Sequence, residues 1–445
     1  MKEDLLQGKI SAVLIRYAVP VILSMAATQF YSIADGMMVG TGLGSPALAA
    51  VSNAAVILQF FMFVSGGMEL GGNLLIAAYR QRMNPEEMTE TVYSLLALDL
   101  AVGMILTAAG QLLAGQLLEW IHTPDEIMSQ SLLYVRIYLL GFPFLMEYDL
   151  MKQILMGSGD SGGPMRLVLL TTCLNIGLDA LLIFVFPFGV GGAAAASALS
   201  QVVGMLLCYR MVFRAILKQR FAIRFLKSAP VKEMIWLSLP TVVQQMMGPV
   251  SNMVRQTRLG MIGVSAIAGF SAANSLSVFL LMPMAGCCQA LVVFTAQNLS
   301  AGQQERTKEA VRVSRRLTAG ITTLLILLCL CFHEQLLSFY TDDREALRYG
   351  TLLLTREPFF YYFYALRNIN ESRLRGFRKM KEYLFSSVLT TGLTAGFTWI
   401  LTGWVGFHGF YLATGLGNLV GMVVSGRLVK KNVWRKVPAK MEETE

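Results

Sequence analysis

Three residues in the first half of this 445-residue chain place oxygen ligands inside long apolar runs. Asp35 lies at the far end of one such run, and Asn175 and Asp179 stand four residues apart in the stretch NIGLD. An i,i+4 pair shares one face of a helix, so these two side chains point the same way. If Asp35 faces them, two carboxylates and an amide oxygen form a set that suits a hard cation such as Na⁺.

A proton is the other ion that such a set can take. Two carboxylates in a low-dielectric pocket do not both stay ionised, so one of them is expected to bind a proton. An ionisable side chain inside a membrane span costs roughly 2.5–3.5 kcal/mol on insertion scales and is usually functional. We therefore predict a cation-coupling site at Asp35, Asn175 and Asp179; a purely structural pairing of the two acids is the alternative.

The composition indicates which elements must hold these residues. Apolar residues make up 55% of the chain, charged residues only 15%, and the mean hydropathy is +0.55. This proportion of apolar to charged residues is well above that of a soluble domain. Repeated apolar runs of about 20 residues are typical of membrane-spanning helices. The sequence therefore predicts an all-α polytopic membrane protein.

Twelve apolar segments are expected to cross the membrane. They cover residues 11–34, 46–78, 91–115, 131–157, 164–186, 190–214, 232–257, 265–298, 309–332, 346–373, 381–403 and 408–428. The breaks between them are alternately rich and poor in Lys and Arg, and the positive-inside rule assigns the basic breaks to the cytoplasm. We expect a multi-pass protein of the cell (plasma) membrane with both termini in the cytoplasm.

The two halves of the chain resemble each other. Pro20 aligns with Pro240, and ALAAVS in the first half is echoed by AIAGFS in the second. Two parallel six-helix lobes, related by an axis along the membrane normal, are typical of transporters. We therefore predict four parts: an N-terminal lobe (1–214), a cytoplasmic linker (215–231), a C-terminal lobe (232–429) and a basic cytoplasmic tail (430–445).

The other chemistry-bearing residues argue against an enzyme. The six cysteines lie in or beside apolar runs, and none has metal-site spacing with a histidine. No Ser-His-Asp set or Gly-rich nucleotide loop is present, and GSGDSGGP is interpreted as a cytoplasmic loop. The net charge of +9 comes from basic loops between spans, which report membrane orientation and not a nucleic-acid partner. Glu69 and Asp99 are explained equally well as structural or functional acids.

Several motifs, in order, resemble those of the multidrug and toxic compound extrusion (MATE) transporters. They are Pro20 followed by Asp35, D-x-x-x-V-G with ALAAVS, G-x-G-D-x-x-x-P from Gly157 to Pro164, N-x-x-x-D at Asn175 and Asp179, and GVGGAAAAS from Gly189 to Ser197. The resemblance extends from about Ile15 to Val429. The DinF-like branch is the closer match, because its acids lie in the first lobe.

The resemblance implies two pseudo-symmetric six-helix lobes around a V-shaped central cavity, and export of amphipathic, often cationic compounds driven by inward movement of H⁺ or Na⁺. It implies an ion site at Asp35, Asn175 and Asp179, with Ser197 where the family usually has threonine. These would be the metal ligands if the ion is Na⁺, and no other cofactor is expected. It also implies that Pro20 is a hinge. Asp149 stands where the family commonly has asparagine, so we expect it to add a charge to the cation-coupling set.

The substrate cavity is expected to include Met38, Gln59, Met253, Arg255 and Asn274. Arg255 and Arg258 are expected to extend to the outer surface of the membrane. A lipid-linked precursor or anionic-metabolite exporter of the same superfamily is an alternative, in which these arginines hold a phosphate; a channel or non-transporting receptor is another. The expected partners are a small-molecule substrate and the lipid bilayer, with the chain as a monomer.

Overall fold

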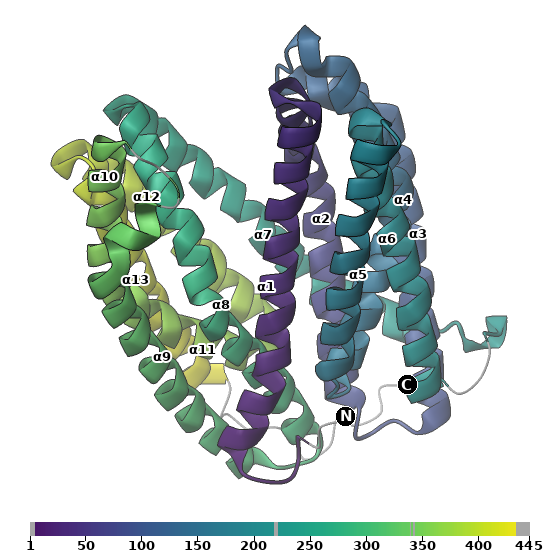
Figure 1. Ribbon diagram of the computed structural model, residues 1–445. Helices are drawn as coiled ribbons and strands as arrows, with labels where there is room; N and C mark the ends of the chain where they lie inside the picture. The colour runs from purple at the N-terminus through teal and green to yellow at the C-terminus, as the bar shows by residue number, and fades with distance from the viewer. Residues whose placement is uncertain (1–4, 218–220, 339, 341–342, 433–445) are drawn as a thin grey trace. The chain divides into compact units, whose positions relative to one another are not determined.

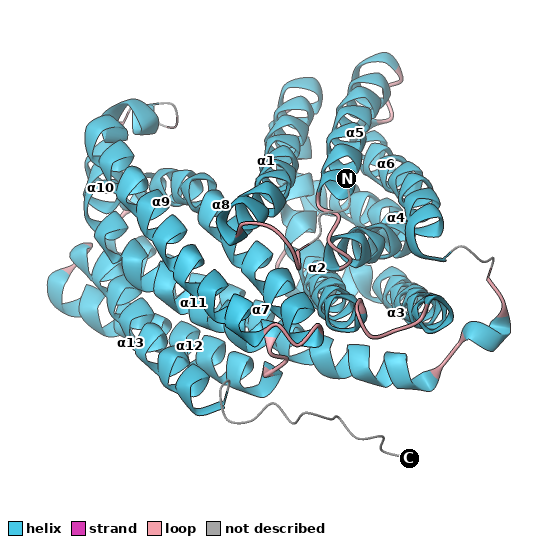
Figure 2. Cartoon of the chain, turned by 90° about the horizontal axis from the view of Figure 1, so that it is seen from below, coloured by secondary structure: helices cyan, strands magenta, loops and turns pink. Residues whose placement is uncertain are grey.

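The computed structural model describes residues 5–217, 221–338, 340 and 343–432, and within these residues every regular element is a helix (Figure 2). Ten helices of this described part are long and apolar enough to cross a membrane. In a bilayer, a helix satisfies its backbone N–H and C=O groups within its own segment, which an isolated strand does not do. The predicted all-α polytopic fold is confirmed.

The helices follow the predicted apolar segments. They are α1 (Ile10–Leu43), α2 (Ser45–Tyr79), α3 (Pro85–Trp120), α4 (Asp125–Gly157), α5 (Gly162–Ala180), α6 (Gly189–Val212), α7 (Ser228–Ile262), α8 (Val264–Ser300), α9 (Gln304–Ser338), α10 (Arg344–Arg356), α11 (Tyr361–Gly376), α12 (Met380–Val405) and α13 (His408–Asn432). The tenth segment differs from its prediction, because a 3₁₀ turn at Glu357–Phe360 divides it into α10 and α11. Pro358 within this turn has no N–H to continue the helix.

The chain divides into two compact units. The N-terminal unit comprises Met1–Gly8 and Ile15–Gln245, and the C-terminal unit comprises Lys9–Leu14 and Met246–Glu445. The division therefore falls inside α7, further along the chain than the predicted linker at 215–231. Residues 218–220 of that linker, and residues 433–445 of the predicted basic tail, lie outside the described residues.

Close packing explains why the first half of α7 belongs to the N-terminal unit. Gly67 and Gly71 of α2 face Val242 and Ser238 of α7. A Cβ atom added at Gly71 would lie 2.1 Å from Ser238 Oγ and 3.2 Å from a backbone oxygen of α7. Small residues of this kind let two membrane helices approach each other at backbone distance.

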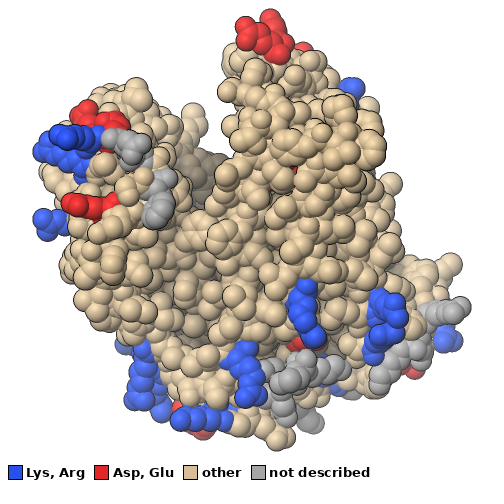
Figure 3. Space-filling model, viewed as in Figure 1, with Lys and Arg blue, Asp and Glu red and all other residues tan. Residues whose placement is uncertain are grey.

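In the N-terminal unit, α4 is the central helix. It packs against α2, α3 and α6, and α6 also packs against α5 (Figure 1). Figure 3 shows acidic side chains at the upper end of this unit and basic side chains toward its lower end. Acids stand at the helix ends that flank the α3–α4 connection, namely Glu119, Asp125 and Glu126, whereas Arg80, Arg82 and Arg166 lie near helix ends on the opposite side of this antiparallel bundle. Such a distribution is the one that the positive-inside rule describes.

The C-terminal unit has its own apolar core. In this unit α8 packs against α9, α10 and α11, and α13 packs against α11 and α12. Leu337, Leu353 and Phe410 are among the buried residues of this core. Each unit thus buries its own apolar helix faces.

Candidate functional site

Three helices of the N-terminal unit bring the predicted coupling residues together. Asp35 comes from α1, Asn175 and Asp179 from α5, and Ser197 from α6. Asp179 is fully buried, and Asn175 and Ser197 are 3% and 1% exposed. Asp35 is partly buried and lies close enough to Asp179 for the two carboxyl groups to interact electrostatically. Four of the five predicted residues therefore form one cluster.

The hydrogen bonds leave part of this cluster unsatisfied. Asn175, with its amide oriented by the surrounding network, donates to Asp179 Oδ2 at 2.9 Å and accepts from the Ser197 N–H at 3.2 Å. The hydroxyl oxygens of Tyr31 and Ser197 are 3.0 Å apart. Among the described residues, the Oδ1 atoms of Asp35 and Asp179 are buried without a hydrogen-bond partner. Buried acceptors without a donor are rare in proteins and mark a place that a cation or proton can fill.

The glycine-rich start of α6 explains how Ser197 reaches α5. A Cβ atom added at Gly192 would lie 2.8 Å from the backbone oxygen of Leu182, in the π-helical turn (Leu181–Val185) that follows α5. Gly189 has a φ of 61°, in the left-handed region that glycine adopts most easily. The close approach of α6 to the end of α5 places Ser197 beside Asn175.

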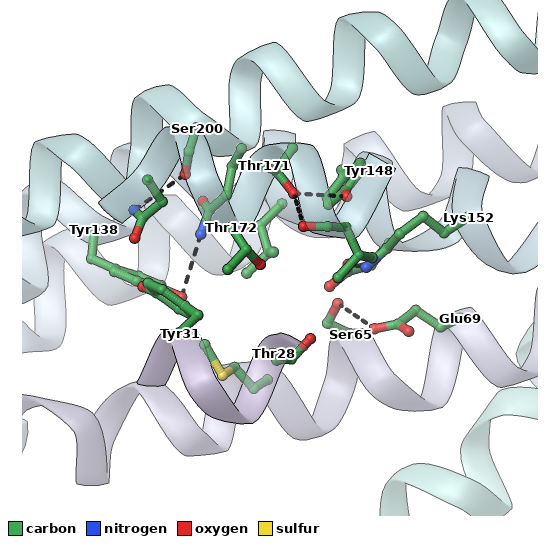
Figure 4. Close-up of a pocket in the computed structure, with 16 residues that line it drawn as sticks. Thr28, Tyr31, Ser65, Glu69, Tyr138, Tyr148, Lys152, Thr171, Thr172 and Ser200 are labelled. Carbon is green, nitrogen blue, oxygen red and sulfur yellow. Dashed lines mark hydrogen bonds and ion pairs between the residues drawn. The ribbon is translucent and has the colours of Figure 1, made fainter. Parts of the chain in front are cut away.

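Asn175 also lines a cavity of about 340 Å³ in the N-terminal unit. Figure 4 shows Tyr31 at one end of this cavity, and Glu69 and Lys152 at the other. Hydroxyl groups lie between the two ends, including Thr171, whose oxygen is 3.1 Å from that of Tyr148. The predicted ion site thus borders a cavity lined mainly by polar side chains.

Asp149 is the predicted coupling residue that lies apart from this cluster. Its carboxylate forms an ion pair with Lys152 one turn later on α4, and the two side chains are 17% and 20% exposed. The ammonium group neutralises the extra negative charge that the sequence predicts for Asp149. Asp149 lines the same cavity, at its charged end.

Lys152, Tyr134 and Tyr138 also belong to this region and were not predicted from the sequence. The two tyrosine rings stack with their centroids 6.1 Å apart on α4. Both tyrosines interact electrostatically with Asp35. The signal in the sequence was a set of polar residues at helical spacing on one face of α4, at positions 134, 138, 149 and 152.

The predicted hinge lies within a continuous helix. Pro20 falls inside α1, and the Ser24 hydroxyl donates to its carbonyl oxygen at 2.9 Å. Of the predicted substrate-cavity residues, Met38 and Gln59 lie on α1 and α2 of the N-terminal unit, and Gln59 is exposed.

The remaining predicted cavity residues belong to the C-terminal unit. Arg255 and Asn274 line a cavity of about 120 Å³ there, and Met253 is 73% exposed. The Arg255 guanidinium lies 5.5 Å from the centre of the Phe270 ring and interacts electrostatically with Glu357. These contacts lie within the C-terminal unit, and the extension of Arg255 to the outer surface of the membrane stays a prediction.

The donor set of the cluster limits the metals that it can hold. Among the described residues, no three His, Cys, Asp or Glu side chains are grouped as a metal site. A Na⁺ ion beside Asp35 and Asp179 would need further oxygen ligands, from the Asn175 amide or from the hydroxyl groups of Ser197 and Tyr31. Such a set suits a monovalent hard cation or a proton better than a transition metal.

The sequence profile of the MatE family matches residues 20–181 and 240–400. The two matches begin at Pro20 and Pro240, the prolines that align in the internal repeat. A probable multidrug resistance protein, YoeA, from Bacillus subtilis is 27% identical over 81% of this chain and 80% of its own length. A protein named FAD transporter from Shewanella oneidensis is 25% identical over 81% of each chain.

A solved structure has the same fold. It is a transporter of the MOP superfamily from Pyrococcus furiosus, described as having a binding pocket of reverse polarity that suggests a different function. It is 22% identical in sequence, covers 97% of both chains and has a TM-score of 0.88. The described part of this chain therefore shares its fold with that structure.

Proposed function

The chain belongs to the MatE family of membrane transporters, and from this premise we propose that it exports amphipathic organic compounds, mainly cations, in exchange for H⁺ or Na⁺. It is a multi-pass membrane protein and a transporter, not an enzyme. The coupling ion, the class of substrate and the cytoplasmic position of both termini are parts of the proposal.

One observation carries the proposal. Asp35 and Asp179 each have a buried carboxyl oxygen without a hydrogen-bond partner among the described residues, and they lie beside a polar cavity. A proton or a Na⁺ ion would supply the interaction that these oxygens lack. The cluster of Asp35, Asn175, Asp179 and Ser197 is therefore proposed as the coupling site.

Coupling requires that the ion binds one conformation more tightly than the other. We assign this difference to α1, because Asp35 is the cluster residue that α1 contributes, whereas Asn175, Asp179 and Ser197 are held by α5 and α6. Binding of an ion would draw α1 toward α5, with Pro20 as the point of bending. Loss of the ion would release α1 and favour binding of substrate from the cytoplasm or the inner leaflet.

Uptake of ethidium, a fluorescent organic cation, into proteoliposomes tests this proposal. A proton gradient and a Na⁺ gradient are imposed separately on the wild type and on Asp35→Asn. We expect uptake to follow one gradient and to disappear in the variant, since the amide cannot bind the proton or supply the charge. Uptake that is unchanged in a folded Asp35→Asn protein would reject the coupling site.

An anionic cargo is the second candidate. The relative named FAD transporter and the Arg255 guanidinium in the C-terminal cavity favour it. Glu357 opposes it, because this acid already interacts with Arg255. Uptake of radiolabelled FAD by the same proteoliposomes, lost in Arg255→Ala, would support this candidate; uptake of ethidium alone would exclude it.

A further inference from the structure

The charged end of the N-terminal cavity already contains a cation. Lys152 of α4 lies at this end (Figure 4) and forms an ion pair with Asp149. Its Nζ atom is 4.3 Å from the centre of the Tyr148 ring. A carboxylate together with an aromatic face is a combination that binds organic ammonium ions. The Lys152 ammonium therefore occupies a cation-binding position that its own helix provides.

One ammonium does not balance the acids around it. Asp149 and Glu69 line the cavity together with Lys152, and Glu69 also interacts electrostatically with Asp99. Asp99 interacts in turn with Glu147. One lysine thus lies beside two carboxyl groups that line the cavity, and a cleft lined by an excess of charges of one sign attracts ligands of the other. This end of the cavity favours a positively charged ligand over an anion.

Glu69 is held loosely enough to contact a ligand. Its two carboxyl oxygens are each 3.5 Å from a donor, the Ser65 hydroxyl for one and the Gln153 amide for the other. Distances of this length are at the limit of a hydrogen bond. A ligand ammonium between Asp149 and Glu69 would therefore gain a contact that the present neighbours of Glu69 do not fully make.

We propose that Lys152 is an internal competitor for an organic ammonium ligand, whose charged group takes the place of the Lys152 Nζ between Asp149 and the Tyr148 ring. The inference rests on the proposed export of organic cations. Lysine carries its charge on a flexible four-carbon chain, which allows it to leave and re-enter this position. Lys152 thus lowers the affinity for cationic ligands and promotes their release, which an exporter requires.

Equilibrium binding of ethidium to the purified full-length protein, without any ion gradient, tests the competition. Lys152→Gln removes the competing charge, and we expect it to tighten ethidium binding about tenfold, on the scale of one desolvated cation–π contact. Lys152→Arg should weaken binding, because a guanidinium holds a carboxylate through two hydrogen bonds. Lys152→Gln combined with Asp149→Asn should return the affinity to the wild-type value or below it.

A matched control is available in the same unit. Lys227 forms an ion pair with Glu90 at 3.2 Å and does not line the cavity, so Lys227→Gln should leave ethidium binding unchanged. Equal or weaker binding in Lys152→Gln would overturn the inference. If Lys152→Gln fails to fold, Lys152→Arg provides the test. Ethidium binding to Lys152→Arg that is as tight as binding to the wild type, or tighter, would also overturn the inference.

The two proposals fail in different ways. If ethidium is transported but Lys152→Gln does not tighten its binding, the export function stands and the competition is wrong. If neither gradient drives uptake but Lys152→Gln still tightens ethidium binding, the competition stands and the proposed antiport is wrong. Binding and transport are measured separately, so each result is assigned to one proposal.

Discussion

At the scale of single residues, Ser197 connects the coupling cluster to the cavity. Its backbone N–H donates to Asn175, and its hydroxyl pairs with Tyr31, which lines the cavity. The serine hydroxyl therefore has two functions that can be separated by substitution: it satisfies the Tyr31 hydroxyl, and it offers an oxygen ligand to a cation beside Asp179.

Replacement of this hydroxyl has a predictable effect. Ser197→Ala removes the hydroxyl oxygen as a ligand of the bound ion, at a cost of about 1 kcal/mol, which corresponds to roughly a fivefold loss in affinity for the coupling ion. Ser197→Thr keeps the oxygen and should behave like the wild type. The ion concentration that gives half-maximal ethidium uptake measures the effect. Wild-type dependence in Ser197→Ala would show that the hydroxyl takes no part in coupling.

The sequence was sufficient for some residues and not for others, for a physical reason. Asn175 and Asp179 were predictable because a four-residue spacing has one meaning on a helix. Lys152 falls within the segment predicted at 131–157 and was not predicted as a site residue, because charge alone does not distinguish a lysine near a cytoplasmic loop from one that pairs with Asp149 inside a cavity. Only the three-dimensional arrangement of α4 separates these cases.

At the scale of elements, the contact between α4 and α6 fixes the position of Ser197 in the site. A Cβ atom added at Gly141 of α4 would lie 2.6 Å from Ala198 Cβ and 2.9 Å from Ala198 Cα. The α6 backbone cannot avoid such a contact without moving, and Ser197 is the adjacent residue. The position of Ser197 therefore depends on a glycine on another helix.

Gly141→Ala should separate these helices. Overpacking of this kind typically costs about 1–3 kcal/mol, so we expect a lower melting temperature together with weaker ion-coupled uptake. Gly115→Ala in α3 is the matched control. A Cβ atom there meets no atom within 4 Å, and alanine favours a helix over glycine by about 1 kcal/mol. Equal melting temperatures for the two variants would contradict the packing argument.

The tenth predicted segment is divided in the structure, and an apolar pattern does not reveal whether a proline within it ends the helix. Hydropathy predicted one helix over 346–373, whereas Pro358 ends α10 and a 3₁₀ turn leads into α11. A proline inside an apolar run can be tolerated, as Pro20 is in α1, or can end a helix. The neighbours that compensate for the lost hydrogen bond decide between these outcomes, and they come from elsewhere in the fold.

At the scale of the whole molecule, the repeat was predictable and the division into units was not. The profile matches at 20–181 and 240–400 have the same offset as the alignment of Pro20 with Pro240. Repeats preserve the order of prolines and glycines, which sequence alone reveals. The first half of α7 joins the N-terminal unit through the close contact of Gly67 and Gly71 with α7, which depends on packing that no linear pattern contains.

The proposed orientation of the chain in the membrane predicts which turns can be reached from outside the cell. Basic breaks lie in the cytoplasm by the positive-inside rule, so an epitope inserted after Arg82 or Gly302 should be hidden in intact cells. An epitope after His122 or Gly406 should be reached by antibody from outside, because the breaks there contain no Lys or Arg. All four positions are in turns between helices, where insertions are tolerated.

Permeabilised cells provide the control, since all four epitopes should then be labelled equally. Labelling of intact cells only after Arg82 and Gly302 would invert the proposed topology, and the coupling ion would then enter from the side now assigned to the substrate. Labelling at only one of Arg82 and Gly302 would contradict the parallel repeat, because these two turns are equivalent in the two six-span halves and must lie on the same side of the membrane.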